Sequence, residues 1–252
     1  MKVLKTLNNN SLGALACGDS YGNAFEMEGL MGKRFHRDTL PDTPLKPAIT
    51  DDTKMALILL QHYKKYGDLN ENLLLKDYRF WAKEDGLADG IGIHTHAVLL
   101  QGKVDKDSQG NGALMRNIPF GVQLIDDGYS FEEAVIFMNR DSALTHANET
   151  IFLANEIALD LALHGVKILN KEHYKPIIKK LHHGYSAWVI HSLYIVIETL
   201  KLELNFLDGF KYIVSQGGDT DTNCAIYGAI RGYKEDILES IDMTRFFSNN
   251  IK

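Results

Sequence analysis

Small residues recur at helical spacing near both ends of the chain, and this pattern constrains the fold more than any other feature of the sequence. A glycine inside a helix costs about 1 kcal/mol relative to alanine, so another interaction must compensate. Close approach of two helices is the simplest compensation. We therefore predict that the first and last helices pack together at the centre of the fold. The residues concerned are Ala14, Cys17, Gly18 and Gly22 in the first helix and Ala225, Gly228, Ala229 and Gly232 in the last.

Helical periodicity dominates the rest of the chain. Met55, Leu59 and Tyr63 follow Asp51-Asp52-Thr53 at helical spacing, and a second such run follows Ser130. Further helices are expected at residues 150–164, 175–182, 188–200 and 206–214. Segment 190–197 is rich in β-branched residues, but its length and spacing fit a buried helix better than a strand. The sequence predicts an all-α fold.

Length and composition fit one globular domain over residues 1–252, because the chain is 45% hydrophobic and 24% charged. The formal net charge is -6 and no long Lys/Arg run occurs, which disfavours nucleic acid as a partner. No apolar stretch reaches the roughly 20 residues that a membrane-spanning helix needs. Cys17 and Cys224 lie too far apart in the sequence to suggest a disulfide framework or a sulfur-rich zinc site. We expect a soluble, cytoplasmic monomer.

Two short polar segments are chemical near-copies of each other. Thr50-Asp51-Asp52-Thr53 precedes one amphipathic helix, and Gly217-Gly218-Asp219-Thr220-Asp221-Thr222-Asn223 precedes the last. Helix capping explains one acidic or hydroxyl residue at each place. Two crowded carboxylates at each helix start are costly unless a cation or a proton offsets their charge. Capping therefore leaves part of the pattern unexplained.

The two acidic segments meet if the first and last helices pack together as predicted. An all-oxygen ligand set favours Mg²⁺, Mn²⁺ or Ca²⁺ over zinc or copper. Two such ions, about 3.5–4 Å apart, would share the set. We therefore predict a divalent metal site whose ligands are Thr50, Asp51, Asp52, Asp219, Asp221 and Thr222.

Five segments, taken in order, resemble the ADP-ribosylglycohydrolase family, which includes the dinitrogenase reductase-activating glycohydrolases. Together they span nearly the whole chain, and the two acidic segments are the most specific of them. The segments are Gly18-Asp19-Ser20-Tyr21-Gly22 with Glu26, Thr50-Asp51-Asp52-Thr53, Gly110-Asn111-Gly112-Ala113-Leu114-Met115-Arg116, Leu144-Thr145-His146 and Gly217-Gly218-Asp219-Thr220-Asp221-Thr222-Asn223.

The resemblance implies a single-domain orthogonal helical bundle with a central cleft that holds two Mg²⁺ or Mn²⁺ ions. It implies hydrolysis of the N- or O-glycosidic bond between ADP-ribose and an acceptor, with an ADP-ribosylated protein or another ADP-ribose conjugate as the substrate. Glu26 becomes an acidic residue beside the metals. In the mechanism that we expect from this arrangement, Asp51 or Asp52 accepts a proton from the attacking water, and Glu26 acts as an acid or base near the leaving group. The implied substrate-binding residues are Gly110, Asn111, Gly112, Ala113, Met115 and His146.

Several single residues have simpler structural explanations. Gly110-Asn111-Gly112 is also a common turn sequence, and His146 is also explained as a helix-start histidine. Arg116 fits an anchor for a buried carboxylate better than a diphosphate ligand. We expect His94 and His96 not to bind metal, since residues two apart on a helix point in different directions. The pair His182-His183 likewise lacks metal-ligand spacing and is expected at the surface.

One departure from the family pattern concerns the acceptor. Many relatives have an acidic residue where this chain has Gly90, and Asp89 lies one place off. A preference for arginine as the acceptor therefore does not follow from the resemblance. Two other functions also remain open: a catalytically silent relative that binds ADP-ribose or serves a structural role, and a two-metal nucleotide phosphohydrolase.

Overall fold

The structure is a computed structural model that describes residues 10–234 and Phe246. These residues form helices and loops and contain no strand; the only β-type pairing among them is an isolated bridge between Gly110 and Trp188. The α-helices, in chain order, are α2 (Asn10–Gly22), α3 (Glu26–Leu30), α4 (Asp51–Tyr66), α5 (Glu71–Glu84), α6 (Ile93–Gln101), α7 (Leu114–Asp126), α8 (Phe131–Ala143), α9 (Glu149–His164), α10 (Lys175–Ile178), α11 (Val189–Lys201), α12 (Phe206–Gln216) and α13 (Thr220–Lys234).

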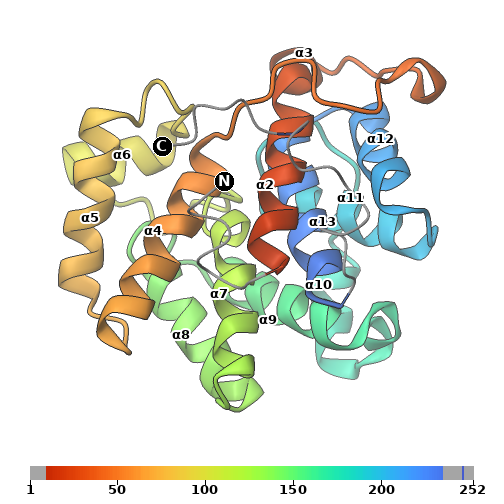
Figure 1. Ribbon diagram of the computed structural model, residues 1–252. Helices are drawn as coiled ribbons and strands as arrows, with labels where there is room; N and C mark the ends of the chain where they lie inside the picture. Colours follow the sequence, from red (N-terminus) through yellow and green to blue (C-terminus); the bar gives the residue numbers. More distant parts are fainter. Residues whose placement is uncertain (1–9, 235–245, 247–252) are drawn as a thin grey trace.

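Helices α2 and α13 pack side by side at the centre of the fold (Figure 1). A methyl group added at Gly18 would overlap the carbonyl group of Cys224, and one added at Gly228 would overlap that of Ala14. The hydroxyl of Ser11 also donates to the carbonyl oxygen of Ala229 over 2.7 Å. The predicted pairing of the first and last small-residue faces is therefore confirmed, and it rests on direct contact between the two backbones.

The remaining helices surround this central pair. Helix α7 packs against α4, α8, α9 and α13, while α13 also contacts α11 and α12. Helices α5 and α6 contact each other at one side of the molecule, next to α4 (Figure 1). Every residue of α2 from Ser11 to Gly22 is buried. The first turns of α4 and α13 therefore meet inside the protein, where their polar residues need partners.

Most of the helices expected from the sequence are present at nearly the expected positions. Helix α8 begins at a capping box, in which the Ser130 hydroxyl accepts from the Glu133 N–H over 3.2 Å and the Glu133 carboxylate accepts from the Ser130 N–H. The expected helices at 150–164, 188–200 and 206–214 correspond to α9, α11 and α12. Helices α5 and α6 were not singled out by the pattern.

The helix expected at residues 175–182 is wrong beyond its first turn. Helix α10 ends at Ile178, and the chain then turns through i to i+3 hydrogen bonds, such as that from the Lys180 N–H to the Ile177 carbonyl oxygen over 2.8 Å. Residues 179, 180 and 182 are polar and exposed. Since they offer no apolar face to bury, nothing compensates for extending this short helix.

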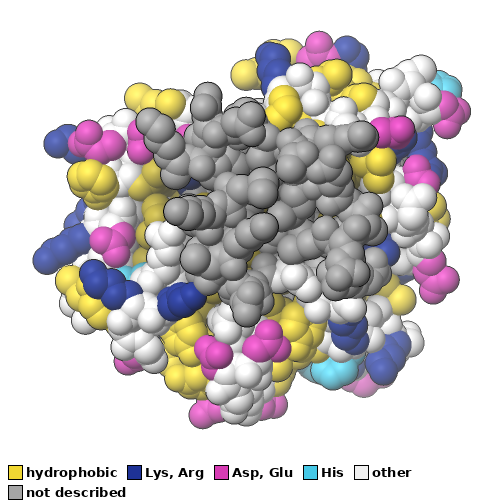
Figure 2. Space-filling model, viewed as in Figure 1, with side chains coloured by type: hydrophobic (Ala, Val, Ile, Leu, Met, Phe, Trp, Pro, Cys, Tyr) yellow, Lys and Arg dark blue, Asp and Glu magenta, His cyan; other side chains and the backbone are white. Residues whose placement is uncertain are grey.

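The surface carries charges of both signs. In Figure 2, Lys and Arg side chains alternate with Asp and Glu side chains around the visible margin of one face. Within the described part of the chain, no helix is both long enough and apolar enough to cross a bilayer. The two cysteines, Cys17 and Cys224, are buried and unpaired. The single domain predicted over residues 1–252 includes segments outside the described residues.

Candidate active site

The start of α4 is capped by a residue of another helix. Asp19, which lies in α2 and is fully buried, accepts hydrogen bonds from the backbone N–H of Thr50 at 2.9 Å and of Thr53 at 3.2 Å. The hydroxyls of both threonines also lie within hydrogen-bonding distance of its carboxylate. Asp51 and Asp52 are therefore not needed as the cap of their own helix.

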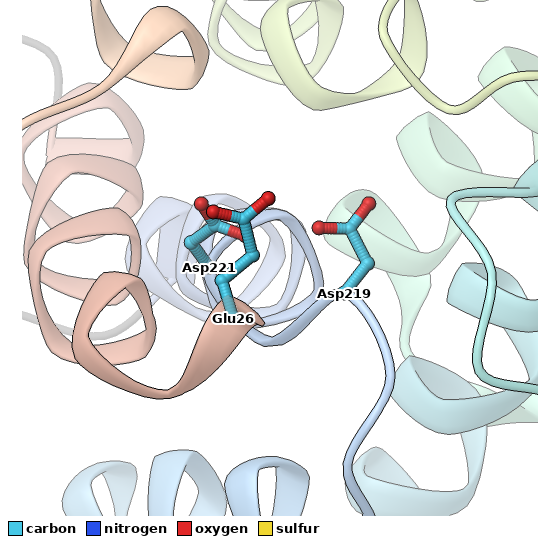
Figure 3. A group of neighbouring side chains, drawn as sticks. All are labelled: Glu26, Asp219 and Asp221. Atoms are coloured by element: carbon cyan, nitrogen blue, oxygen red, sulfur yellow. The ribbon is translucent and has the colours of Figure 1, made fainter. Parts of the chain in front are cut away.

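Three carboxylates converge on one point, two of them from the acidic segment before α13 and one from the start of α3. Glu26 begins α3, Asp219 lies just before α13, and Asp221 lies in the first turn of α13; Figure 3 shows their carboxylate groups facing a common space. Each residue offers one oxygen atom, and these atoms all lie within 4.8 Å of one another. Asp219 and Asp221 are buried, whereas Glu26 is half-buried. Three oxygen atoms at this spacing can serve as part of the ligand set of one metal ion.

The two acidic segments meet in a single cavity of about 260 Å³. The Thr222 hydroxyl lies 3.4 Å from Oδ2 of Asp52, which joins the start of α13 to the start of α4. Thr50 is buried, and its hydroxyl lies 3.2 Å from the same Asp52 oxygen. The convergence expected from the sequence is therefore present. The acidic and hydroxyl residues that line the cavity are Glu26, Asp51, Asp52, Asp219, Asp221, Thr222 and Thr95.

Burial and mutual repulsion raise the proton affinity of this cluster. The pKa values of Asp51, Asp52 and Asp221 lie well above the usual range, first because the groups are buried and then because other carboxylates surround them. Burial, followed by the charge of Asp219, raises the pKa of Glu26 to about 7. Burial raises the pKa of Asp19 to about 6, although hydrogen bonds from two threonines oppose this shift.

One oxygen of the cluster has no protein partner. Oδ1 of Asp52 is buried and makes no hydrogen bond. A buried carboxylate oxygen without a donor is unfavourable unless a cation faces it. Together with the all-oxygen composition of the cluster, this orphaned atom fits a hard divalent cation.

The glycine-rich loop before α7 is tied to the acidic cluster through Asn111. Its side-chain amide donates to Oδ2 of Asp219 over 2.7 Å and to the hydroxyl of Ser192 over 3.0 Å. Its backbone N–H donates to the carbonyl oxygen of Ala187 over 3.0 Å. The backbone N–H of Asn111 therefore already has an acceptor within the protein. The loop contributes Gly110, Asn111 and Gly112 to the cavity lining, and the first turn of α7 contributes Met115. Ala113 is buried and does not line the cavity.

The two glycines of this loop pack against His146. A Cβ atom added at Gly112 would lie 3.0 Å from Cε1 of the imidazole, and one added at Gly110 would lie 3.2 Å from Nε2. Any side chain at either position would push the ring away. The glycines therefore have a steric reason that the sequence pattern did not reveal. His146 itself is buried and lines the cavity.

His146 is held as a neutral ring. Burial, followed by the charges of Arg116 and His94, lowers its pKa well below the usual value. Thr145 Oγ1 accepts from Arg116 over 2.9 Å and lies 2.8 Å from Nδ1 of His146. Since this hydroxyl accepts from arginine, its own hydrogen is available for Nδ1. His146 then carries its hydrogen on Nε2, next to Gly110.

Arg116 serves a buried carboxylate, as expected. Its guanidinium is fully buried and donates to Oδ2 of Asp141 over 2.8 Å and to the carbonyl oxygen of Gly112 over 3.0 Å. Tyr78 donates to the other Asp141 oxygen over 2.8 Å. The arginine thus supports the loop and His146 from behind and does not line the cavity.

Asp89, the acidic residue that is one place off the family pattern, does not line the cavity either. Its Oδ2 accepts from the indole N–H of Trp81 over 2.8 Å. Gly90 has φ = 88°, a conformation that favours glycine, and it lines the cavity together with Gly92 and Ile93.

His94 also reaches the cavity, but its Nε2 donates to the carbonyl oxygen of Thr145 over 2.8 Å. Thr95, Ser192 and Asp141 are the supporting residues that the sequence analysis did not single out.

The fold and the site define a helical protein in which a cluster of mostly buried oxygen donors lines one cavity. The sequence model of the ADP-ribosylglycohydrolase family matches residues 8–235. The chain belongs to this family, and it is accordingly a hydrolase of glycosidic bonds.

Individual relatives cover most of the chain. The ADP-ribosyl-(dinitrogen reductase) glycohydrolase of Rhodospirillum rubrum is 25% identical over 256 residues, which is 90% of this chain and 86% of that protein. A protein of Acanthamoeba polyphaga mimivirus named as an ADP-ribosyl glycohydrolase is 24% identical over 290 residues, covering 89% and 85% of the two chains. A solved ADP-ribosylglycohydrolase-related protein complex has the same fold, with a TM-score of 0.66 and 21% identity over 91% of this chain and 88% of that one.

Proposed function

We propose that the protein removes ADP-ribose from a modified acceptor, with an ADP-ribosylated protein as its substrate, and that it needs two Mg²⁺ or Mn²⁺ ions to do so. The observation that carries this proposal is the meeting of both acidic segments in one cavity beside the loop of Asn111. The relative in Rhodospirillum rubrum is named for a protein substrate, which supports the same substrate class here.

The oxygen donors suit the proposed ions. We assign Thr50, Asp51, Asp52, Asp219, Asp221 and Thr222 as ligands, and the orphaned Oδ1 of Asp52 supports this assignment. When bound, such ions supply positive charge to the carboxylate cluster and polarise oxygen atoms presented to them. Two ions suit the set better than one, because the donors come from two segments and number more than one octahedral Mg²⁺ takes from protein in a typical site.

The remaining residues bind and orient the substrate in this proposal. Asn111, held by Asp219 and Ser192, keeps the glycine-rich loop against the cavity. Neutral His146 offers its Nε2–H as a donor to a substrate oxygen. Glu26 lies at the half-buried edge of the cluster, where it can exchange a proton with the leaving group or with water. Asp51 or Asp52 accepts the proton that the attacking water loses. The bond to the anomeric carbon breaks through a transition state with oxocarbenium character.

The acceptor need not be arginine. A guanidinium at the acceptor site would seek a carboxylate, and Asp89 is occupied by the indole of Trp81. A panel of arginine-linked, serine-linked and nucleic-acid-linked ADP-ribose conjugates measures the preference directly. A rate at least ten-fold higher for one linkage identifies the acceptor.

The test of the activity itself measures the products. Purified protein is incubated with an ADP-ribosylated protein and Mg²⁺ or Mn²⁺, and the soluble products are separated by chromatography. We expect intact ADP-ribose, and no product after chelation or in Asp221→Asn. Release of AMP would instead identify a nucleotide phosphohydrolase. Binding of ADP-ribose without any product would identify a silent relative, and turnover that survives thorough chelation would refute the metal requirement.

A further inference from the structure

A pair of histidine side chains lies outside the acidic cavity, at the two ends of the segment that leads into α11. His182 follows the turn after α10, and His191 lies in the first turn of α11. The two residues are nine positions apart, yet their Nε2 atoms are 3.2 Å apart. His182 is exposed and His191 is partly exposed, so solvent reaches this pair.

The geometry of the pair matches two ligands of one ion. Zinc binds imidazole nitrogen at about 2.0–2.1 Å with tetrahedral angles, which places two such nitrogens about 3.4 Å apart. The two rings are also nearly perpendicular, with an interplanar angle of 77° and centroids 4.8 Å apart.

Each ring is anchored through its other nitrogen. Nδ1 of His182 donates to the carbonyl oxygen of Lys180 over 2.9 Å, so its Nε2 carries a lone pair, and this lone pair accepts from the Nε2–H of His191. Nδ1 of His191 lies 2.9 Å from the hydroxyl of Ser186. A hydroxyl both donates and accepts, so this contact survives if His191 moves its hydrogen to Nδ1 and frees Nε2. Metal-binding histidines commonly have such partners on the second ring nitrogen.

The surroundings keep His191 in place and uncharged. Its ring packs against the backbone of Gly184, where no Cβ atom would fit, and it stacks on Trp188 at a centroid distance of 5.8 Å. Burial lowers its pKa, and the neighbouring imidazoles of His182 and His183 add to this shift, although a hydrogen bond with Ser186 opposes it. A neutral imidazole is the form that binds metal.

We propose that His182 and His191 form a binding site for a borderline divalent transition metal ion such as Zn²⁺, separate from the acidic cluster. Imidazole ligands favour Zn²⁺, Ni²⁺ and Cu²⁺ over Mg²⁺. The ion joins the two ends of segment 182–191, whose Ala187 lines the active-site cavity and accepts from the backbone of Asn111. Metal at this site therefore restrains one wall of the cavity. The proposal does not depend on the reaction that the cavity performs.

Isothermal titration calorimetry on untagged protein tests the proposed His182–His191 site. Saturating Mg²⁺ is present to occupy the oxygen donors, and Zn²⁺ is titrated into the wild type, His182→Ala, His191→Ala and His36→Ala. His36 is an exposed histidine elsewhere on the surface and serves as the matched control. We expect one Zn²⁺ site whose affinity falls at least ten-fold in each of the first two variants and is unchanged in the control. Equal binding in all four proteins, or no Zn²⁺ binding by the wild type, overturns the proposal.

A second measurement avoids any effect of the substitutions on folding. Ring-proton NMR signals of His182 and His191 in the wild-type protein are followed as Zn²⁺ is added in the presence of Mg²⁺. Both signals should shift or broaden together at one equivalent of Zn²⁺, while the signal of His36 stays constant. Signals of His182 and His191 that do not respond would contradict the proposal even if zinc binds elsewhere.

Discussion

The backbone N–H of Thr53 donates a hydrogen bond to Oδ2 of Asp19 over 3.2 Å, although the two residues lie 34 positions apart. Helix α4 thus receives its cap from α2. A helix start usually takes its cap from its own chain neighbours, with Ser, Thr, Asp or Asn just before the first turn. Because the cap comes from elsewhere, both aspartates in the first turn of α4 are free to face the cavity.

Asp19→Ala should reduce both stability and activity. The substitution leaves two backbone donors and the Thr53 hydroxyl without their acceptor, so we expect the free energy of unfolding to fall by about 2 kcal/mol. It should also lower kcat, because the first turn of α4 carries Asp51 and Asp52. Urea denaturation and the ADP-ribose release assay measure the two effects.

Ser130→Ala is the matched control for this variant. It removes a helix cap of similar chemistry at the exposed start of α8, away from the cavity. Stability should fall by about 1 kcal/mol while activity per folded molecule is unchanged. If Asp19→Ala behaves like Ser130→Ala and loses only stability, Asp19 has no role in arranging the site.

Asp52→Asn should have opposite effects on two quantities: it should raise the stability of the metal-free protein and lower the stabilisation that a bound metal ion gives. Removing one of several crowded carboxylates relieves repulsion, so in the presence of chelator the free energy of unfolding should rise by about 1 kcal/mol. The same variant should lose most of the thermal stabilisation that Mn²⁺ gives to the wild type. Differential scanning calorimetry with and without Mn²⁺ measures both.

Glu132→Gln provides the comparison for this prediction. It removes one exposed negative charge from the first turn of α8. Neither the free energy of unfolding in chelator nor the stabilisation by Mn²⁺ should change by more than about 0.5 kcal/mol. A destabilised Asp52→Asn protein in chelator, with an undiminished response to Mn²⁺, would show that Asp52 is a structural residue and no ligand.

The central pairing of helices could be predicted because its cause is visible in the sequence. Gly18 and Gly228 lie on faces made of small residues, and only close backbone contact accounts for them. The pairing then brought the two acidic segments together without further information. The family resemblance supplied the predicted substrate-binding residues, which periodicity alone does not identify.

Other parts of the site depend on tertiary contacts that leave no local pattern. The position of Asp19 as a cap follows only from the placement of α2 beside α4. Asp141 gives no local signal of its partner, since it lies 25 positions from Arg116. The orientation of Asp89 depends on an indole that a residue pattern does not place. Side-chain pairing across helices is therefore what the sequence could not reveal.

Arg116→Met should be among the most damaging single substitutions. It leaves the buried Asp141 carboxylate without its cation, and breaking a buried ion pair in this way costs about 3–5 kcal/mol. The double variant Arg116→Met/Asp141→Leu should recover part of that loss, because no unpaired charge remains. Chemical denaturation of both variants tests this.

Lys33→Met is the control for ion pairing at the surface. Lys33 pairs with Glu28, and both side chains are more than half exposed, so less than about 1 kcal/mol should be lost. A double variant that is less stable than Arg116→Met would mean that Asp141 acts mainly through Tyr78 and Asn117, which also donate to it.

Asp160 should make part of the stability dependent on acid pH. Burial alone would raise the pKa of its carboxyl, but hydrogen bonds from Lys171, His164 and Tyr174 outweigh burial and lower it. A carboxyl whose pKa is lower in the folded state stabilises the fold above its unfolded pKa of about 3.9 and loses this effect as pH falls through the folded value.

Asp160→Asn should therefore cost stability at pH 6 and progressively less below pH 4. We expect about 1 kcal/mol at pH 6, because Lys171 is about half exposed and water screens its charge. Asp38→Asn, an exposed change beside His36, should leave the stability unchanged at either pH. Urea denaturation from pH 3 to pH 6 gives the difference curves. A difference between wild type and Asp160→Asn that stays constant down to pH 3 would mean that the side chain acts through packing and neutral hydrogen bonds, since only its charge is lost in acid.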